Sequence, residues 1–174
     1  MLHSSLLKRF HQLFNPQSGP VLDLACGKGQ NGLYLKQYNI DVIFADIQQH
    51  CLNNLIHINN VSPSHCWHAD FETKSIDNLK LAEMSLQGVI VFKYLHRPLF
   101  PAIKAAIKPG GFVIYETFTT DNRKFGRPNR DAFLLKSGEL KTLFEGWEIL
   151  FYFEGIKANP DRAIAQIICK KPLL

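Results

Sequence analysis

VLDLACGKGQNGLYL, residues 21–35, joins a short apolar run to a helical pattern through three glycines. Gly27, Gly29 and Gly32 match the spacing G-x-G-x-x-G, which lets a backbone turn closely beneath a nucleotide-type cofactor. Asp46 ends the next apolar run, nineteen residues beyond Gly27, where a carboxylate can accept hydrogen bonds from both hydroxyls of a ribose. NAD, FAD and S-adenosylmethionine sites all present this pattern, so the glycines alone leave the cofactor open.

A nucleoside triphosphate is disfavoured at this loop. The interval from Gly27 to Gly32 mimics a P-loop, but Leu33 and Tyr34 stand where that motif requires Lys and Ser or Thr. The phosphate-binding lysine and the magnesium-binding hydroxyl are therefore missing.

Apolar runs alternate with helical patterns along the rest of the chain, which predicts a parallel sheet with right-handed crossovers. The last two runs are separated by turn residues without room for a helix, so they predict an antiparallel hairpin. We therefore expect one α/β domain over residues 1–174, with a doubly wound, mostly parallel seven-stranded sheet and an antiparallel C-terminal hairpin. The expected strands are 20–26, 40–46, 65–71, 88–95, 112–118, 147–155 and 163–171, and the expected helices include 51–56, 99–107 and 137–144, the last capped by Ser137.

Residues 1–16 predict an amphipathic helix. Its apolar positions recur at helical spacing, and docking on the domain's own core is a commoner use of such a stripe than lying on a membrane. The basic residues within it argue against a secretory signal. The stripe comprises Leu2, Leu6, Leu7, Phe10, Leu13 and Phe14.

Composition sets broader limits. A chain of 174 residues with 46% hydrophobic content fits a single domain, and no apolar run is long enough to cross a bilayer. Net charge of +5 suits an anionic partner but gives only weak support for nucleic acid binding. The four cysteines show no C-x-x-C pair, which favours reduced thiols and a cytoplasmic protein.

Asp23 separates the possible cofactors. If the first strand stays extended, Asp23, Ala25 and Gly27 project to one side and the carboxylate points toward the mouth of the site. A carboxylate there repels a pyrophosphate and attracts an ammonium or a sulfonium, and S-adenosylmethionine carries both cations. The alternative is that Asp23 merely caps the adjoining turn.

Asp70 and Phe71 follow the third expected strand. A carboxylate there can accept a hydrogen bond from an adenine amino group while the aromatic ring covers a face of the base. The alternative is that Asp70 caps a helix or a turn.

Together, the stretches DLACGKGQNG, FADI, HADF and IKPGGFVIYETF resemble, in order and approximate spacing, the class I S-adenosylmethionine-dependent methyltransferases over most of the chain. More narrowly, KYLHRPLFPAIKAAIKPGG followed by KFGRPNRDAFLLKSGEL resembles the small tellurite-resistance-like methyltransferases.

This resemblance implies a cofactor site with S-adenosylmethionine as the cofactor. The backbone of residues 25–29 then lines the methionine part, Lys93 lies beside it, and Asp46 holds the ribose. Lys93 departs from the family because a cation there opposes a sulfonium, so it uses only its backbone carbonyl or pairs with the cofactor carboxylate. The implied cofactor-binding residues are Asp23, Ala25, Gly27, Gly29, Asn31, Asp46, Ile47, Asp70, Phe71 and Lys93, with Ile47 and Phe71 on the adenine faces and Asp70 on its amino group.

Residues 117–136 form a long connection that predicts a lid over the substrate. Its cations suit an oxyanion, and we expect Tyr94, Arg123 and Arg127 to contact the acceptor; the alternative is a solvated charged loop. The stretch KYLH after the fourth strand lacks the Asn/Asp-Pro-Pro-aromatic motif of nucleobase amine methylation, which disfavours that acceptor.

His96 and Arg97 follow the same strand and are the candidate catalytic residues. His96 can deprotonate a thiol, selenol or hydroxyl, and Arg97 can bind an anionic acceptor, unless the HRP stretch simply caps the next helix. His65 and His68 tempt a zinc interpretation, but strand alternation places them on opposite faces, so we predict no metal site.

The sequence therefore predicts an S-adenosylmethionine-dependent methyltransferase that acts on a small molecule, either a chalcogen oxyanion or a thiol. Three alternatives remain. An RNA or protein methyltransferase would have the same cofactor site, and an NAD-dependent oxidoreductase would have the same glycine-rich loop. A non-catalytic module that only binds the cofactor would have both features. We expect no membrane partner, and nucleic acid is disfavoured.

Overall fold

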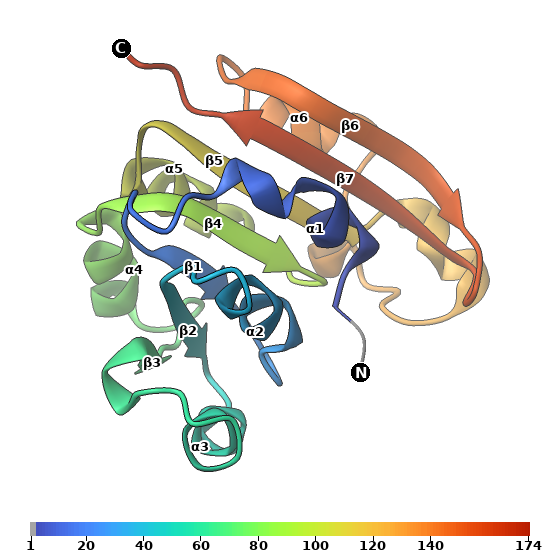
Figure 1. Ribbon diagram of the computed structural model, residues 1–174. Helices are drawn as coiled ribbons and strands as arrows, with labels where there is room; N and C mark the ends of the chain where they lie inside the picture. Colours follow the sequence, from blue (N-terminus) through green and yellow to red (C-terminus); the bar gives the residue numbers. More distant parts are fainter. Residues whose placement is uncertain (1–2) are drawn as a thin grey trace.

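A seven-stranded sheet forms the centre of the computed structural model, which describes residues 3–174 (Figure 1). The strands lie in the order β3-β2-β1-β4-β5-β7-β6. The first five are parallel, whereas β7 runs antiparallel to both β5 and β6. The strands are β1 Val21–Leu24, β2 Val42–Asp46, β3 Cys66–His68, β4 Leu86–Phe92, β5 Ile107–Phe118, β6 Glu148–Lys157 and β7 Arg162–Lys170. The predicted fold class is confirmed.

Helices cover both faces of this sheet. Apolar residues of α1, α2 and α3 pack on one face, and those of α4, α5 and α6 pack on the other (Figure 1). The α-helices are α1 Ser5–Phe10, α2 Gln30–Lys36, α3 Gln49–His57, α4 Ser75–Ala82, α5 Phe100–Ala106 and α6 Glu139–Leu143. The short 3-10 helices are η1 His11–Leu13, η2 Pro63–His65, η3 Arg97–Leu99, η4 Thr120–Phe125 and η5 Asp131–Phe133.

The strand order places a switch point between β1 and β4. From β1 the chain proceeds outward through β2 and β3, and from β4 it proceeds in the other direction to β5. The loops after β1 and β4 therefore leave toward opposite faces, which opens a crevice at the carboxyl ends of these two strands. β4 can occupy the middle because its residues Val89, Ile90 and Val91 are all fully buried.

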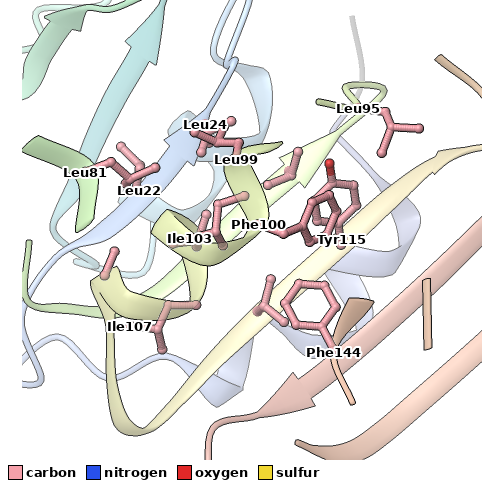
Figure 2. Close-up of a cluster of buried hydrophobic side chains, with 14 of the residues drawn as sticks. Leu22, Leu24, Leu81, Leu95, Leu99, Phe100, Ile103, Ile107, Tyr115 and Phe144 are labelled. Atoms are coloured by element: carbon pink, nitrogen blue, oxygen red, sulfur yellow. The ribbon is translucent and has the colours of Figure 1, made fainter. Parts of the chain in front are cut away.

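The core on the α5 side fixes the loop that follows β4. Phe100 of α5 stacks on Tyr115 of β5, with ring centroids 5.2 Å apart (Figure 2). The Tyr115 hydroxyl donates a hydrogen bond of 2.8 Å to the carbonyl of Tyr94. A buried aromatic pair thus holds the backbone of a predicted site residue.

The N-terminal segment is less regular than the helix expected over residues 1–16. α1 makes fewer than two turns before the chain tightens into η1, and Ser4 caps it by accepting a hydrogen bond from the Leu6 N–H. Leu7 and Phe14 are buried against the sheet. Leu2 of the expected stripe lies outside the described residues.

Several local expectations were wrong. β3 has only three residues because the chain leaves the sheet at Ala69, and Ile107 begins β5 instead of ending a helix. Ser137 does not cap α6, since the N-cap position is Gly138 in a left-handed conformation. α4 was missed because its apolar residues Ile76 and Leu79 are exposed and give no amphipathic stripe.

In the described part of the chain, no helix combines the length and apolar character that crossing a bilayer requires.

Candidate cofactor and acceptor site

The glycine-rich loop leaves β1 earlier than strand alternation predicts. β1 ends at Leu24, and Ala25 already has a left-handed φ of 53°. Gly27 and Gly29 also adopt positive φ, and the Gly29 N–H closes the turn on the Cys26 carbonyl at 2.9 Å. The condition for Asp23, Ala25 and Gly27 to share one side, an extended strand through Gly27, is therefore not met, although Asp23 and Ala25 line the same cavity.

Asp23 combines the two roles that the sequence left as alternatives. The residue is 2% exposed, and its carboxylate accepts a 2.8 Å hydrogen bond from the Gly32 N–H in α2. The same residue lines a cavity of about 430 Å³, which we call the inner cavity. Burial raises the pKa of Asp23 to about 8, although the Gly32 N–H opposes this effect.

This raised pKa predicts how pH affects stability. The folded-state pKa lies above the unfolded value, so the folded protein holds an extra proton between about pH 4 and pH 8. The stabilising contribution of Asp23 is thus complete at low pH and is lost as pH rises through about 8. Asp23→Asn keeps the acceptor for Gly32 but cannot ionise. We expect its melting temperature, relative to wild type, to be higher at about pH 8.5 than at about pH 5; parallel curves would contradict this pKa.

Asp46 lies at the end of β2 and closes the other side of the loop. Its Oδ2 accepts a 2.7 Å hydrogen bond from the Gly27 N–H, and its Oδ1 accepts one of 2.8 Å from the Gln48 N–H. Each carboxylate oxygen can accept a further hydrogen bond, so two acceptor positions remain. Asp46 lines a second cavity of about 510 Å³, which we call the outer cavity.

The inner and outer cavities meet at Ala25 and Lys93, which line both. Every predicted cofactor-binding residue except Gly29 lines one of them. The inner cavity is lined by Asp23, Ala25, Asn31 and Lys93, and the outer cavity by Ala25, Gly27, Asp46, Ile47, Asp70, Phe71 and Lys93.

Asp70 also combines two roles. Its Oδ1 accepts hydrogen bonds from the N–H groups of Glu72 and Thr73, at 3.1 and 3.0 Å, so it caps the turn after β3. The hydrogen bond from the Thr73 hydroxyl is the main cause that lowers the pKa of Asp70. It is therefore an ionised acceptor at the edge of the outer cavity, beside buried Phe71.

Lys93 occupies a special backbone position at the end of β4. Its φ is 59°, and its N–H donates a 2.8 Å hydrogen bond to the Glu116 carbonyl. A non-glycine residue held in this conformation often marks a functional turn. The exposed side chain of Lys93 lines the inner and outer cavities and also a third cavity of about 290 Å³.

The residues present fit S-adenosylmethionine. Gln30 lines the inner cavity, and its Oε1 is a buried acceptor without a hydrogen-bond partner among residues 3–174. A Cβ built on Gly27 would meet no atom within 4 Å, which leaves the loop open toward the outer cavity. An acceptor for an ammonium thus lies at one end and acceptors for ribose and adenine at the other.

The chain also matches a family model. The family described as tellurite resistance protein TehB matches residues 2–161. The chain belongs to this family. The prediction of a class I methyltransferase relative of the tellurite-resistance type is therefore confirmed.

The chain is also similar to individual members of the TehB family and to solved methyltransferase structures. A probable S-adenosyl-L-methionine-dependent methyltransferase TehB from Haemophilus influenzae is 29% identical over 143 residues, covering 78% of this chain and 48% of that protein. The chain thus spans about half the length of the curated relatives it matches. The crystal structure of Haemophilus influenzae TehB aligns with a TM-score of 0.73, at 19% identity, over 98% of this chain and 62% of that one. A methyltransferase from Anabaena variabilis gives 0.70, at 16% identity, over 95% and 82%. These alignments show a shared fold.

Most of the predicted catalytic and acceptor-binding residues of the TehB-family chain lie outside the inner and outer cavities. Tyr94 lines the outer cavity, but His96, Arg97, Arg123 and Arg127 line neither the inner nor the outer cavity. Arg97 cannot bind an anionic acceptor as placed, because its guanidinium forms a two-pronged ion pair with Glu139, with Nε–Oε1 at 2.5 Å and Nη2–Oε2 at 2.9 Å.

The other predicted acceptor-binding cations, and the two histidines considered for zinc, also lie outside these cavities. Arg123 pairs with Asp131 and donates a 3.1 Å hydrogen bond to the Asn129 carbonyl, and Arg127 is exposed. His65 bonds to Asp41, whereas His68 bonds to a backbone carbonyl. No group of three or more potential metal-ligating side chains occurs within residues 3–174.

Sequence reasoning missed several residues that line the inner cavity. Glu116 of β5 is 6% exposed and accepts a hydrogen bond from the Gln166 side chain of β7. Gln30, Arg162 and the N-terminal segment around Ser4 line the same cavity. An acidic residue inside the apolar strand FVIYETF was a usable signal, because buried carboxylates are rare without a partner or a ligand.

Proposed function

We propose that this chain is an S-adenosylmethionine-dependent methyltransferase that acts on a small molecule, either a chalcogen oxyanion or a thiol. The observation that carries the proposal is the joined pair of cavities, with Asp23 at one end, Asp46 at the other, and Ala25 and Lys93 where they meet. This arrangement matches a ligand with a cationic end and a ribose-containing end. Membership of the TehB family supports the same activity.

The roles follow from the chemistry of the lining residues. Asp46 would accept hydrogen bonds from the ribose hydroxyls, and Asp70 one from the adenine amino group. Ile47 and Phe71 would cover the adenine with apolar surface. When bound, S-adenosylmethionine supplies an electrophilic methyl group on a sulfonium.

The inner cavity would hold the methionine end. Asp23 would bind its ammonium, and Gln30 and Asn31 line the same cavity. Lys93 would pair with the cofactor carboxylate or face the acceptor. In-line attack on a sulfonium disperses charge and needs no covalent intermediate with the protein. The protein would therefore act by positioning the reactants and excluding water.

Alternative functions receive less support. Asp23 in the inner cavity offers no positive charge to the pyrophosphate of NAD, which weakens the oxidoreductase alternative. The third cavity beside Lys93 measures about 290 Å³, which suits a small acceptor better than an RNA or a protein segment. We place the activity in the cytoplasm, consistent with four unpaired cysteines.

Calorimetry tests the proposal directly. S-adenosylmethionine, S-adenosylhomocysteine and NADH would each be titrated into the protein. We expect binding of the first two in the micromolar range and none of NADH. Binding of NADH alone would overturn the methyltransferase proposal and leave Asp23 with only its structural role at Gly32. Cofactor binding without transfer to any selenite, tellurite or thiol acceptor would favour the non-catalytic alternative.

A further inference from the structure

One edge of the sheet is a long strand whose outer side is unpaired in the described part of the chain. β6 stands last in the strand order, and β7 is its one neighbour among residues 3–174 (Figure 1). The outer side of such a strand presents a row of backbone N–H and C=O groups that can pair with another strand. With ten residues, β6 is long enough to act as a template for a further strand.

β6 carries a β-bulge near its start. Ile149 pairs with Cys169 of β7 and Phe151 pairs with Ile168, so Leu150 is an extra residue without a partner of its own. In a regular strand, positions 149 and 151 would lie on the same face. Here the extra residue places their side chains on opposite faces of the sheet.

Two isoleucines at opposite ends of β6 are exposed on one face of the sheet. Ile149 pairs with Cys169 and Ile156 with Ala163, and these two β7 residues lie an even number of positions apart. Both isoleucines therefore face the side of α5 and α6, where Cys169 is part of the core. Their exposed fractions are 44% for Ile149 and 57% for Ile156, so each still offers apolar surface for burial.

Opposite charges lie at the two ends of β6 on the other face. Glu148 pairs with Lys170 of β7, and Lys157 pairs with Arg162. Neither Glu148 nor Lys157 forms an ion pair within residues 3–174. The Lys157 ammonium lies 4.3 Å from the ring centroid of Phe153 and opposite a second cation, an arrangement that an acidic neighbour on its outer side would stabilise.

These features complement one another when β6 pairs with a second copy of itself in the antiparallel direction. In this register Phe153 lies opposite Phe153 of the second copy, and the bulged Leu150 is passed over as it is in the pairing with β7. Every paired set of side chains then lies on a common face, as antiparallel strands require. The pairs are Glu148–Lys157, Ile149–Ile156, Phe151–Gly155, Tyr152–Glu154 and Phe153–Phe153.

Neighbouring registers are less complementary. A register centred on Glu154 places this carboxylate opposite its own copy, and like charges directly opposite each other are destabilising. A register centred on Tyr152 places Ile149 opposite Glu154, so the apolar pair is lost. Registers centred between two residues would pair side chains that lie on opposite faces.

We propose that β6 is a homodimer interface, at which two copies of this chain join their β6 strands in the antiparallel direction and form one continuous sheet. Two-fold symmetry supplies each of the outer contacts twice, the ion pair between Glu148 and Lys157 and the apolar pair between Ile149 and Ile156. Backbone hydrogen bonds would contribute affinity, and the side-chain pairs would fix the register. This proposal does not depend on the proposed methyltransferase function.

Sedimentation equilibrium of the full chain is the first test. We expect the mass of a dimer, with a dissociation constant in the micromolar range or below. A chain that remains monomeric at about 100 μM would overturn the proposal.

A charge swap tests the contact between the strand ends. Lys157→Glu would place two carboxylates opposite each other at both ends of the interface, and Glu148→Lys two ammonium groups, so we expect each variant to weaken dimerisation at least about tenfold. The double variant restores opposite charges and should return to within about threefold of wild type. Lys36→Glu, on the exposed end of α2, is the control and should leave the dimer unchanged. Thermal melts check that each variant is folded. Folded single variants that dimerise as wild type, or a double variant no better than the single ones, would contradict the interface.

Disulfide trapping tests the register. The double variant Glu148→Cys and Lys157→Cys would place one thiol opposite another at both ends of the interface, at the Cα separation that a disulfide needs. Within one chain these two positions lie roughly 30 Å apart along β6, so a disulfide between them must join two chains. Under mild oxidation we expect a covalent dimer from the double variant and none from either single variant. A double variant that dimerises without cross-linking, or single variants that cross-link equally well, would overturn this pairing.

Discussion

Asp46→Ala is expected to weaken S-adenosylhomocysteine binding by about 100-fold or more. The Asp46 carboxylate has one backbone donor on each oxygen and one further acceptor position on each, facing the outer cavity. Two ribose hydroxyls bound to a charged acceptor contribute about 1.5–3 kcal/mol each, so their loss amounts to roughly 3–6 kcal/mol. The measurement is calorimetric titration of wild type and variant.

The design must separate binding from folding, because the same carboxylate holds the Gly27 and Gln48 N–H groups. Asp46→Asn retains one acceptor oxygen and the side-chain shape, so it should fall between wild type and Asp46→Ala. Asp41→Asn is the matched control, since Asp41 is an exposed aspartate just before the same strand, paired with His65. A thermal melt of each variant checks the fold. Wild-type affinity in a folded Asp46→Ala protein would mean that the ribose is bound elsewhere.

Gly32→Ala, in the first turn of α2, is expected to lower stability more than Gly27→Ala in the preceding loop. A Cβ at Gly32 would lie 2.4 Å from Cε1 of Phe44 and 2.9 Å from Oδ2 of Asp23. Both neighbours are buried side chains and cannot move freely, so α2 must shift away from the sheet. Overpacking of this kind costs about 1–3 kcal/mol, and weakening the Gly32–Asp23 hydrogen bond adds about 1 kcal/mol. The melting temperature should fall by roughly 5–15 °C.

Gly27→Ala provides the contrast. A Cβ at Gly27 meets no atom within 4 Å, so the substitution brings only the strain of a positive φ, on the order of 1 kcal/mol. Gly27 lines the outer cavity, and the added methyl group would occupy space near the cofactor. We expect Gly27→Ala to affect cofactor affinity more than stability and Gly32→Ala to affect stability more. Equal losses of stability in the two variants would show that the clash at Gly32 is relieved.

The fold could be predicted from the sequence because the patterns that indicate strands and turns involve only neighbouring residues. Apolar runs such as that of β4 are typical of strands covered on both faces, and the absence of a helix between the last two runs predicts the hairpin. The glycine spacing and the position of Asp46 also depend only on short-range geometry, since the loop must turn with positive φ directly after a strand. These features predicted part of the lining of the inner and outer cavities, but not Gln30, Glu116 or Arg162 of the inner one.

Other features depended on contacts between distant segments. The sequence predicts that Arg97 binds an anionic acceptor. In the structure its hydrogen-bond partners lie 34 to 42 residues further along the chain, and no local sequence pattern indicates them. The left-handed Ala25 similarly reflects packing around the loop and not a preference of alanine.

The sequence by itself determined the succession of strands along the chain and the presence of Asp23, Asp46 and Asp70 in the two cavities, because strand periodicity and turn preferences act over a few residues. Only the tertiary structure decided which charges remain for the acceptor. In the folded chain Arg97 pairs with Glu139 and Arg123 with Asp131, and residues 117–136 place Phe133 at the cavity beside Lys93. Whether a charged side chain faces a ligand or a protein partner depends on which long-range contacts satisfy it, and those contacts exist only in the folded chain.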